Sequence, residues 1–433
     1  MRNLGRITIA IAFSILFGSA AFGQSPSSQT ADIEAFKKTA PKVYIDCGMC
    51  DIEYIKTEIT FVNYVRDRKE ADVHVLITTQ STGSGGREWT LHFSGQNGYS
   101  GLDDTVKYFS NQTDTEDDVR KGLVKTIKMG LMAYVAKTPI AGRIAVSYAE
   151  EKKPEAGADK WDSWVFNLSA NGYFNGEKTY KSSSFGGNFS ANRVTPALKI
   201  KLGLSASYDK NRYDYGDTII RSDQESYSFS GLVVKSIDEH WSVGGYLSAS
   251  SSTYGNINFD LAPAPAVEYN IFPYAQSTRR QLRILYKLGL RSVRYREETI
   301  YLKTRETLWG ESLSITLDVK EKWGSISTSL SGSHYFHDFS KNNLELFSVV
   351  QLNLFKGLNA YVLGGGARIR DQLALVKGEA SLEEIILRRR QLETGYNYFF
   401  MFGLSYTFGS IYTNVVNPRF GSSGSSGMSI NIY

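Results

Sequence analysis

Residues 396–408 read YNYFFMFGLSYTF, a stretch in which every second residue, beginning with the first, is large and apolar or aromatic. The side chains between them include the small or polar Asn397, Gly403 and Ser405. A period of two indicates a β-strand with one apolar and one polar face. In a soluble protein the apolar face would cover a core, whereas in a membrane barrel it would face lipid.

The same alternation recurs about twelve times after residue 164. It is cleanest at residues 198–209, where Leu, Ile, Ala and Tyr alternate with Lys, Gly, Ser and Asp. The expected strands are centred on residues 166–171, 182–193, 198–209, 227–233, 241–250, 265–275, 282–291, 313–320, 325–331, 344–354, 358–370 and 396–408. The fold class we expect is mainly β, an antiparallel transmembrane β-barrel over residues 164–408.

Loop lengths support this interpretation. The connections after every second strand are short, and most of the others are longer, the longest covering residues 371–393. Short turns at one end and long loops at the other are typical of outer-membrane barrels. The last strand should then pair with the first, because an unpaired strand edge is too costly in hydrocarbon. The short connections are residues 193–196, 236–240, 276–280, 321–324 and 355–357.

The N-terminus resembles a secretory signal. Residues 1–23 combine two arginines, an apolar run from Ile7 to Phe17 and small residues before Gln24. The apolar run is short for a membrane-spanning helix, which is the competing interpretation. Export of the chain would place the barrel in the outer membrane, in contact with lipid and with the machinery that inserts barrels. The modest positive charge is spread along the chain and does not indicate nucleic-acid binding.

Residues 24–40 are expected to be a flexible segment and residues 41–150 a small α+β domain in the periplasm. Strands are expected at residues 42–46, 72–78 and 88–95, and helices at 51–65 and 115–137. Residues 151–163 would be a polar linker, and residues 409–433 a periplasmic tail that either stays free or adds a further pairing through residues 428–433.

The sequence offers few groups for chemistry. Cys47 and Cys50 are the two cysteines of the chain, and an exported protein meets an oxidising compartment, so we expect a local disulfide. Idle thiols, a redox motif of thioredoxin type and a metal site are the alternatives. His334 and His337 could hold a metal, although a polar rim at the level of the lipid headgroups is the simpler interpretation. Because no nucleophile and base are paired, we expect no enzyme activity, no cofactor and no metal.

Two groups of mainly charged residues are candidates for contact with solutes or lipid. The first would face the interior of the barrel and comprises Lys199, Lys201, Arg283, Lys287, Arg291 and Lys320. The second lies in the longest loop, where a capping box predicts a short extracellular helix whose basic residues could meet lipid phosphates or could simply be solvated. It comprises Ser381, Glu384, Arg388, Arg389 and Arg390.

The chain resembles uncharacterised outer-membrane barrel proteins of Bacteroidetes-type bacteria that carry an N-terminal periplasmic domain. The resemblance is carried by residues 61–68 with 72–78 and by residues 406–412 with 414–420. It implies a class and no established activity. The function we expect is a narrow, porin-like pore or passive transporter for small solutes with a weak anion preference. The alternative is an envelope assembly or tethering protein, anchored by the barrel, whose domain docks a periplasmic partner.

Overall fold

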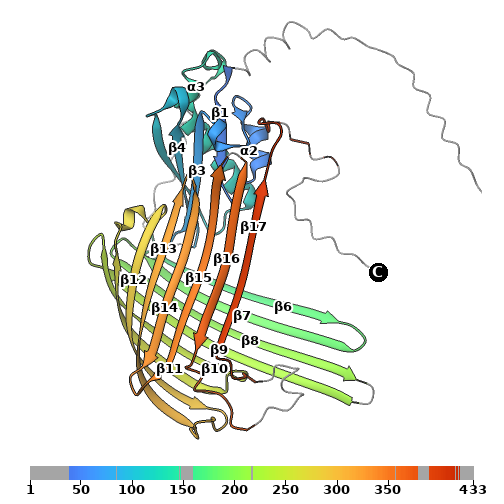
Figure 1. The fold of residues 1–433 in the computed structure, drawn as a ribbon, viewed down its shortest axis with the longest axis vertical. Helices are drawn as coiled ribbons and strands as arrows, with labels where there is room; N and C mark the ends of the chain where they lie inside the picture. Colours follow the sequence, from blue (N-terminus) through green and yellow to red (C-terminus); the bar gives the residue numbers. More distant parts are fainter. Residues whose placement is uncertain are drawn as a thin grey trace, which may run out of the picture.

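The computed structural model describes residues 39–83, 85–145, 147, 159–215, 218–355, 357–378, 390–414, 416–417 and 419. The expected signal peptide, nearly all of the expected flexible segment and most of the expected linker lie outside these residues. The described chain forms a small α+β domain followed by a large antiparallel sheet, so the mainly β fold class is confirmed (Figure 1). No helix among the described residues is long and apolar enough to cross a membrane.

The α+β domain holds a five-stranded sheet in the order β2-β1-β3-β4-β5, with β1 parallel to β2 and β3 and the other pairs antiparallel. Its elements are β1 (Lys42–Asp46), α2 (Ile52–Glu58), β2 (Asn63–Tyr64), β3 (Val73–Ser81), β4 (Arg87–Gly95), β5 (Asp103–Ser110) and α3 (Glu116–Val135), with short 3-10 helices at Arg68–Glu70, Asn97–Tyr99 and Pro139–Arg143.

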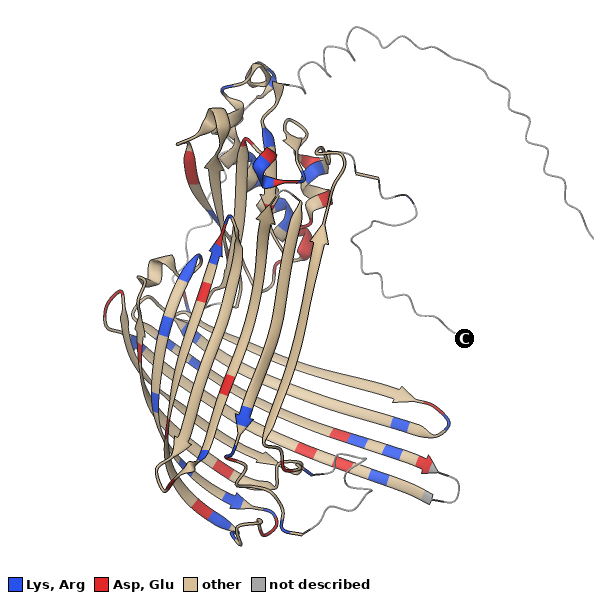
Figure 2. Cartoon of the chain, viewed as in Figure 1, with Lys and Arg blue, Asp and Glu red and all other residues tan. Residues whose placement is uncertain are grey.

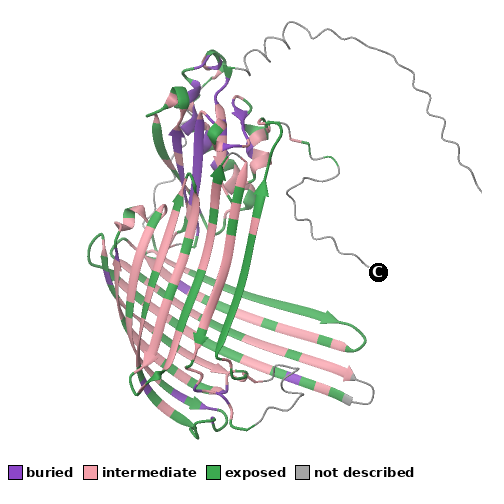
Figure 3. Ribbon diagram, in the orientation of Figure 1, coloured by how far each residue is buried: buried purple, intermediate pink, exposed green. Residues whose placement is uncertain are grey.

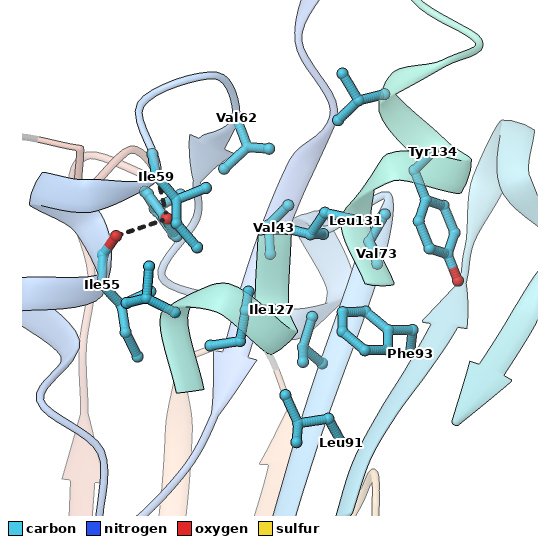
Figure 4. Packing of buried hydrophobic residues seen from close by; sticks show 14 of the residues in the cluster. Val43, Ile55, Ile59, Val62, Val73, Leu91, Phe93, Ile127, Leu131 and Tyr134 are labelled. Atoms are coloured by element: carbon cyan, nitrogen blue, oxygen red, sulfur yellow. Dashed lines mark hydrogen bonds between the residues drawn. The ribbon is translucent and has the colours of Figure 1, made fainter. Parts of the chain in front are cut away.

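Helix α3 begins at a capping box, in which Thr115 and Asp118 satisfy each other's backbone N–H groups. Its apolar face, with Ile127 and Leu131, packs against the sheet (Figure 4). At Gly130 a Cβ atom would lie 2.2 Å from the ring of Phe93, so only glycine permits this close approach. Buried residues concentrate in this domain, which therefore has a core of its own (Figure 3).

Two details of the domain differ from the sequence-based expectation. The helix expected at residues 51–65 ends at Glu58, because Ile59 turns into the core and Asn63–Tyr64 pairs with β1 as strand β2. Strand β5 was not predicted. It is the edge strand, and its exposed polar residues obscure the apolar alternation.

The large sheet contains the twelve expected strands, each antiparallel to its neighbour in chain order. The strands are β6 (Trp164–Gly176), β7 (Tyr180–Val194), β8 (Leu198–Tyr215), β9 (Thr218–Ser236), β10 (Trp241–Ser252), β11 (Ile257–Asn270), β12 (Arg280–Tyr295), β13 (Arg305–Glu321), β14 (Gly324–Tyr335), β15 (Asp338–Phe355), β16 (Leu358–Ile369) and β17 (Tyr396–Tyr406), with a 3-10 helix at Tyr274–Gln276.

Strand β11 begins earlier than the 265–275 predicted, because two prolines mask its pattern. The ladder between β11 and β12 runs in one register on both sides of a gap at residues 262–265. Pro263 and Pro265 lie in this gap and have no N–H to donate. By that register they lie opposite Leu290 and Leu288. The sheet therefore has a local break in its hydrogen-bond ladder.

The predicted pairing of the last strand with the first is not formed in this structure. In the part of the chain that is described, no ladder joins β17 to β6, which are the two edges of the sheet. Strands β6–β9 diverge from β13–β17, so the sheet is strongly curled but open (Figure 1). Water can solvate both edges, and the penalty for leaving them unpaired arises only in hydrocarbon.

Candidate functional site

The register of the large sheet places the six predicted interior charges on one face. A continuous row of paired residues runs from Lys199 through Val234, Gly244 and Ala266 to Lys287, and paired residues share a face. Arg283 and Arg291 lie on the same face of β12, and Lys201 on that of β8. Lys320 on β13 also lies on this face, where it is paired with Ser325 of β14. We call this surface the inner face.

The two faces differ as the alternation predicts. Ser, Asn and Gly dominate the inner face, where Ser205 and Ser228 share a hydrogen bond of 2.7 Å across neighbouring strands. Leu, Ile, Val, Phe and Tyr dominate the other face, which we call the outer face. Its side chains are exposed, including Leu204 and Phe402. Charged bands on the strands are shown in Figure 2.

Some of the cations on the inner face are balanced by nearby groups. Arg291 lies 2.9 Å from Asp260 and donates to the hydroxyl of Tyr335 at 3.1 Å. Arg283 lies 3.8 Å from Glu268, and the ammonium of Lys287 lies 5.3 Å from the centre of the Tyr246 ring. The inner face is thus a polar surface that carries both signs of charge, with lysines near its turn end.

The α+β domain covers the turn end of the large sheet (Figure 1). One face of its sheet packs on the helices through residues such as Val73, Val75 and Phe93. The opposite face, which we call the docking face, lies over the turns of the large sheet. A cavity of about 320 Å³ between them is lined by Tyr44, Asp46, Leu76 and Thr78 and by the inner-face residues Lys320, Ser325, Gln351 and Asn353.

Hydrogen bonds join the domain to the turns. The Oδ2 atom of Asp67 accepts from the backbone N–H of Gly357 at 2.7 Å, and Gly357 has a positive φ of 74° that suits glycine. Arg68 donates to the carbonyl of Asn353 at 3.1 Å, and Arg66 to the carbonyl of Ser410 at 2.8 Å. These contacts fix the loop after β2 against the turn between β15 and β16 and against the segment after β17.

The chain beyond β17 also pairs with the domain. Val65 and Tyr412 form an isolated antiparallel bridge, with Arg66 N donating to Ile411 O at 2.8 Å and Thr413 N to Tyr64 O at 2.9 Å. This bonding pattern makes Val65 and Tyr412 a non-hydrogen-bonded pair. The first residues of the tail thus extend the edge of the small sheet. The pairing predicted as possible for residues 428–433 lies outside the described residues.

Three titratable groups lie on the docking face. His74 is fully buried, with its Nε2 atom 3.2 Å from Asp46 Oδ2. Burial, reinforced by the negative charge of Asp46, raises the pKa of Tyr44 to about 12, so this phenol stays neutral. Burial lowers the pKa of His92, and the positive charge of Arg279 in a turn of the large sheet lowers it further. The neutral form of His92 is therefore favoured where the two parts meet.

The remaining predicted residues are not brought to this site as a catalytic group. Cys47 and Cys50 form a disulfide at the start of α2, with their Cα atoms 5.7 Å apart, and Cys47 lines the cavity under the docking face. Ser381, Glu384, Arg388 and Arg389 lie outside the described residues, and Arg390 donates to the carbonyl of Gly378 at 3.3 Å. Within the described part of the chain, no cluster of three His, Cys, Asp or Glu residues could hold a metal ion.

Sequence reasoning missed the docking face and the pairing of the tail. The docking face could have been recognised from the sequence, because polar residues alternate with core residues on β3 and β4. These polar residues are His74, Thr78, Thr90 and His92. The pairing of Val65 with Tyr412 had no local signal, because it depends on where the last strand ends.

No family model matches the chain, and no curated protein matches its sequence. Among solved structures the chain is similar to the NanC porin, with 10% identity over 56% of this chain and 99% of that chain and a TM-score of 0.27. It is also similar to the β domain of the Bordetella autotransporter BrkA (13% identity, 57% and 98% covered, TM-score 0.25) and to the translocator domain of the autotransporter NalP from Neisseria meningitidis (8% identity, 57% and 80% covered, TM-score 0.17). At these scores the similarities carry no argument about function, and the resemblance to Bacteroidetes-type proteins stays a prediction.

The pairing of the tail predicts an efficient engineered disulfide. Val65→Cys combined with Tyr412→Cys should cross-link under mild oxidation, because the Cα atoms of a non-hydrogen-bonded pair lie about 4.5 Å apart, within the range of a disulfide. A mobility shift on a non-reducing gel measures the link. Val65→Cys combined with Tyr406→Cys is the control and should stay unlinked. Equal cross-linking of both pairs would contradict the pairing.

The lowered pKa of His92 predicts a pH dependence of the α+β domain. A base whose pKa falls on folding adds stability that is complete above its ordinary pKa near 6.5 and is lost as the pH falls toward the lowered value. His92 faces Arg279, Lys322, Asp103 and His74, and its Nδ1 atom lies 2.9 Å from the hydroxyl of Thr105. Urea unfolding of the domain, followed by pulse proteolysis at several pH values, should show this loss. His92→Gln should reduce it, and an unchanged pH profile in that variant would refute the assignment.

Proposed function

We propose that the large sheet closes in the outer membrane into a twelve-stranded barrel, with its outer face in lipid and its inner face in water. The observation that carries this proposal is the division of the strands into an exposed apolar face and a polar face, maintained from β6 to β17. A soluble protein rarely leaves so much continuous apolar surface uncovered. Lipid, and the machinery that inserts barrels, are the partners this proposal implies.

We propose further that the barrel is a narrow pore for small solutes, with the α+β domain over its periplasmic end. Barrels of ~8 strands are nearly filled by side chains, whereas those of 16–18 strands enclose open channels, so twelve strands leave a restricted passage. Lys199 and Lys201 near the turn end favour anions. The cavity of about 320 Å³ under the docking face, between the inner face and the domain, is the point at which solutes would leave the pore.

An envelope tether is the second candidate. The edge strand β5 is open on one side, and Phe109 on it is 58% exposed, so the domain offers a sheet edge to a periplasmic partner while the barrel anchors the chain. An enzyme is not part of the proposal.

Planar-bilayer recordings of the full chain should show a small conductance with an anion preference. Lys201→Glu combined with Arg283→Glu should move the reversal potential toward cation selectivity, because both side chains lie on the inner face. Lys235→Glu is the matched control, since this lysine lies on the outer face at the end of β9 and should leave the selectivity unchanged. A protein that inserts, as judged by heat-modifiable gel migration, yet stays silent would reject the pore and favour the tether.

A further inference from the structure

The outer face of β12–β14 contains one acidic residue far from any strand end. Glu311 lies between Trp309 and Leu313 along β13 and pairs with Leu288 on one side and His334 on the other. Among the described outer-face residues of these three strands, the other acidic and basic side chains lie at a strand end or next to one. An ionisable group placed on an apolar membrane surface is costly and signals a site.

The carboxylate of Glu311 is held by two neighbours. The hydroxyl of Tyr286 donates to Oε2 at 2.5 Å, and the Nε2 atom of His334 lies 2.9 Å from Oε1. Each carboxylate oxygen therefore has a neighbouring side chain within hydrogen-bond distance. The ring of His334 is in turn packed against Phe339, at 4.7 Å between ring centres, and Phe336, at 5.7 Å. The result is a fixed negative charge with an aromatic border.

The break in the ladder lies beside this cluster. Pro263 and Pro265 cannot donate to β12, so Leu290 and Leu288 opposite them receive no ladder bond from these residues. A cavity of about 170 Å³ also lies at the break, but most of its lining, including Lys287, Arg291 and Ser312, belongs to the inner face. Leu288 is also the strand partner of Glu311. The break in the ladder and the carboxylate of Glu311 therefore lie one strand apart.

The position suits the surface of a bilayer. His334 is one residue from the end of β14, and the turn that follows it leads directly into β15 at Asp338. Trp309 and Phe339 are exposed beside the cluster, as aromatic side chains at a membrane interface are. Although β13 continues to Arg305, the end of β14 and these aromatic side chains favour the headgroup level for this cluster.

We propose that Glu311, Tyr286 and His334 form a binding site for the primary ammonium of a lipid headgroup, such as that of phosphatidylethanolamine. An ammonium carries a positive charge that complements the carboxylate and N–H donors that match the carboxylate oxygens. The aromatic border adds attraction for a cation. The site rests on the proposed membrane location of the outer face.

Native mass spectrometry of the full chain in detergent tests the site, with phosphatidylethanolamine and phosphatidylglycerol of the same acyl chains as probes. The wild type should bind the ethanolamine lipid about tenfold more tightly, and Glu311→Gln should lose this preference, because the amide carries no charge to pair with the ammonium. Glu345→Gln is the matched control, since Glu345 lies on the inner face, and it should keep the preference.

Three results would overturn the site: equal binding of the two lipids by the wild type, an unchanged preference in Glu311→Gln, or equal competition by soluble phosphoethanolamine, which would exclude a lipid as the ligand. Heat-modifiable migration of each variant separates this inference from the proposed function. A protein that forms a barrel but shows no ethanolamine preference rejects the headgroup site alone, whereas one that forms no barrel rejects both.

Discussion

The backbone hydrogen-bond ladder that runs from β6 to β17 is the constraint on which the rest of the structure depends. A strand with a neighbour on each side can pair its backbone donors and acceptors with both neighbours. Because successive side chains point to opposite faces, the sheet then has one polar and one apolar face. The ladder is incomplete at the two edges and at Pro263 and Pro265. Unpaired backbone groups at these places can bind water, but in hydrocarbon each would cost several kcal/mol. A sheet that enters a membrane therefore needs a partner for them.

The α+β domain uses the same physical rule on a smaller scale. Its sheet is covered by helices on one side and by the turns of the large sheet on the other, so β3 is buried on both faces. Asp67 and Arg68 bind the end of β15 and the turn after it, and the first residues of the tail pair with the edge of the small sheet at Val65. Each part therefore covers polar groups of the other, and the domain lies over the turn end of the large sheet.

The large sheet could be predicted from sequence because its information is local. Residues 198–209 and 396–408 each show their two faces without reference to any other strand, and the short turns give the order. Strand β5 and the start of β11 were missed where edge exposure and prolines remove the alternation. In the domain, the helix expected at residues 51–65 ends before Ile59, because burial of Ile59 in the core outweighs the helical propensity of the sequence. The docking contacts and the Glu311 cluster join residues far apart in sequence, and the individual residues carry no sign of their partners.

Closure of the sheet in a membrane is the central claim, and distances between β6 and β17 test it most directly. A spin label at Ala170, in the middle of β6, would be combined in turn with labels at the outer-face positions Tyr398, Phe400, Phe402 and Leu404 of β17, in protein reconstituted into lipid bilayers. Neighbouring strands lie about 5 Å apart, so at least one pair should show strong dipolar broadening at short range. If all four pairs instead give the long distances of an open sheet in bilayers, the barrel account is contradicted.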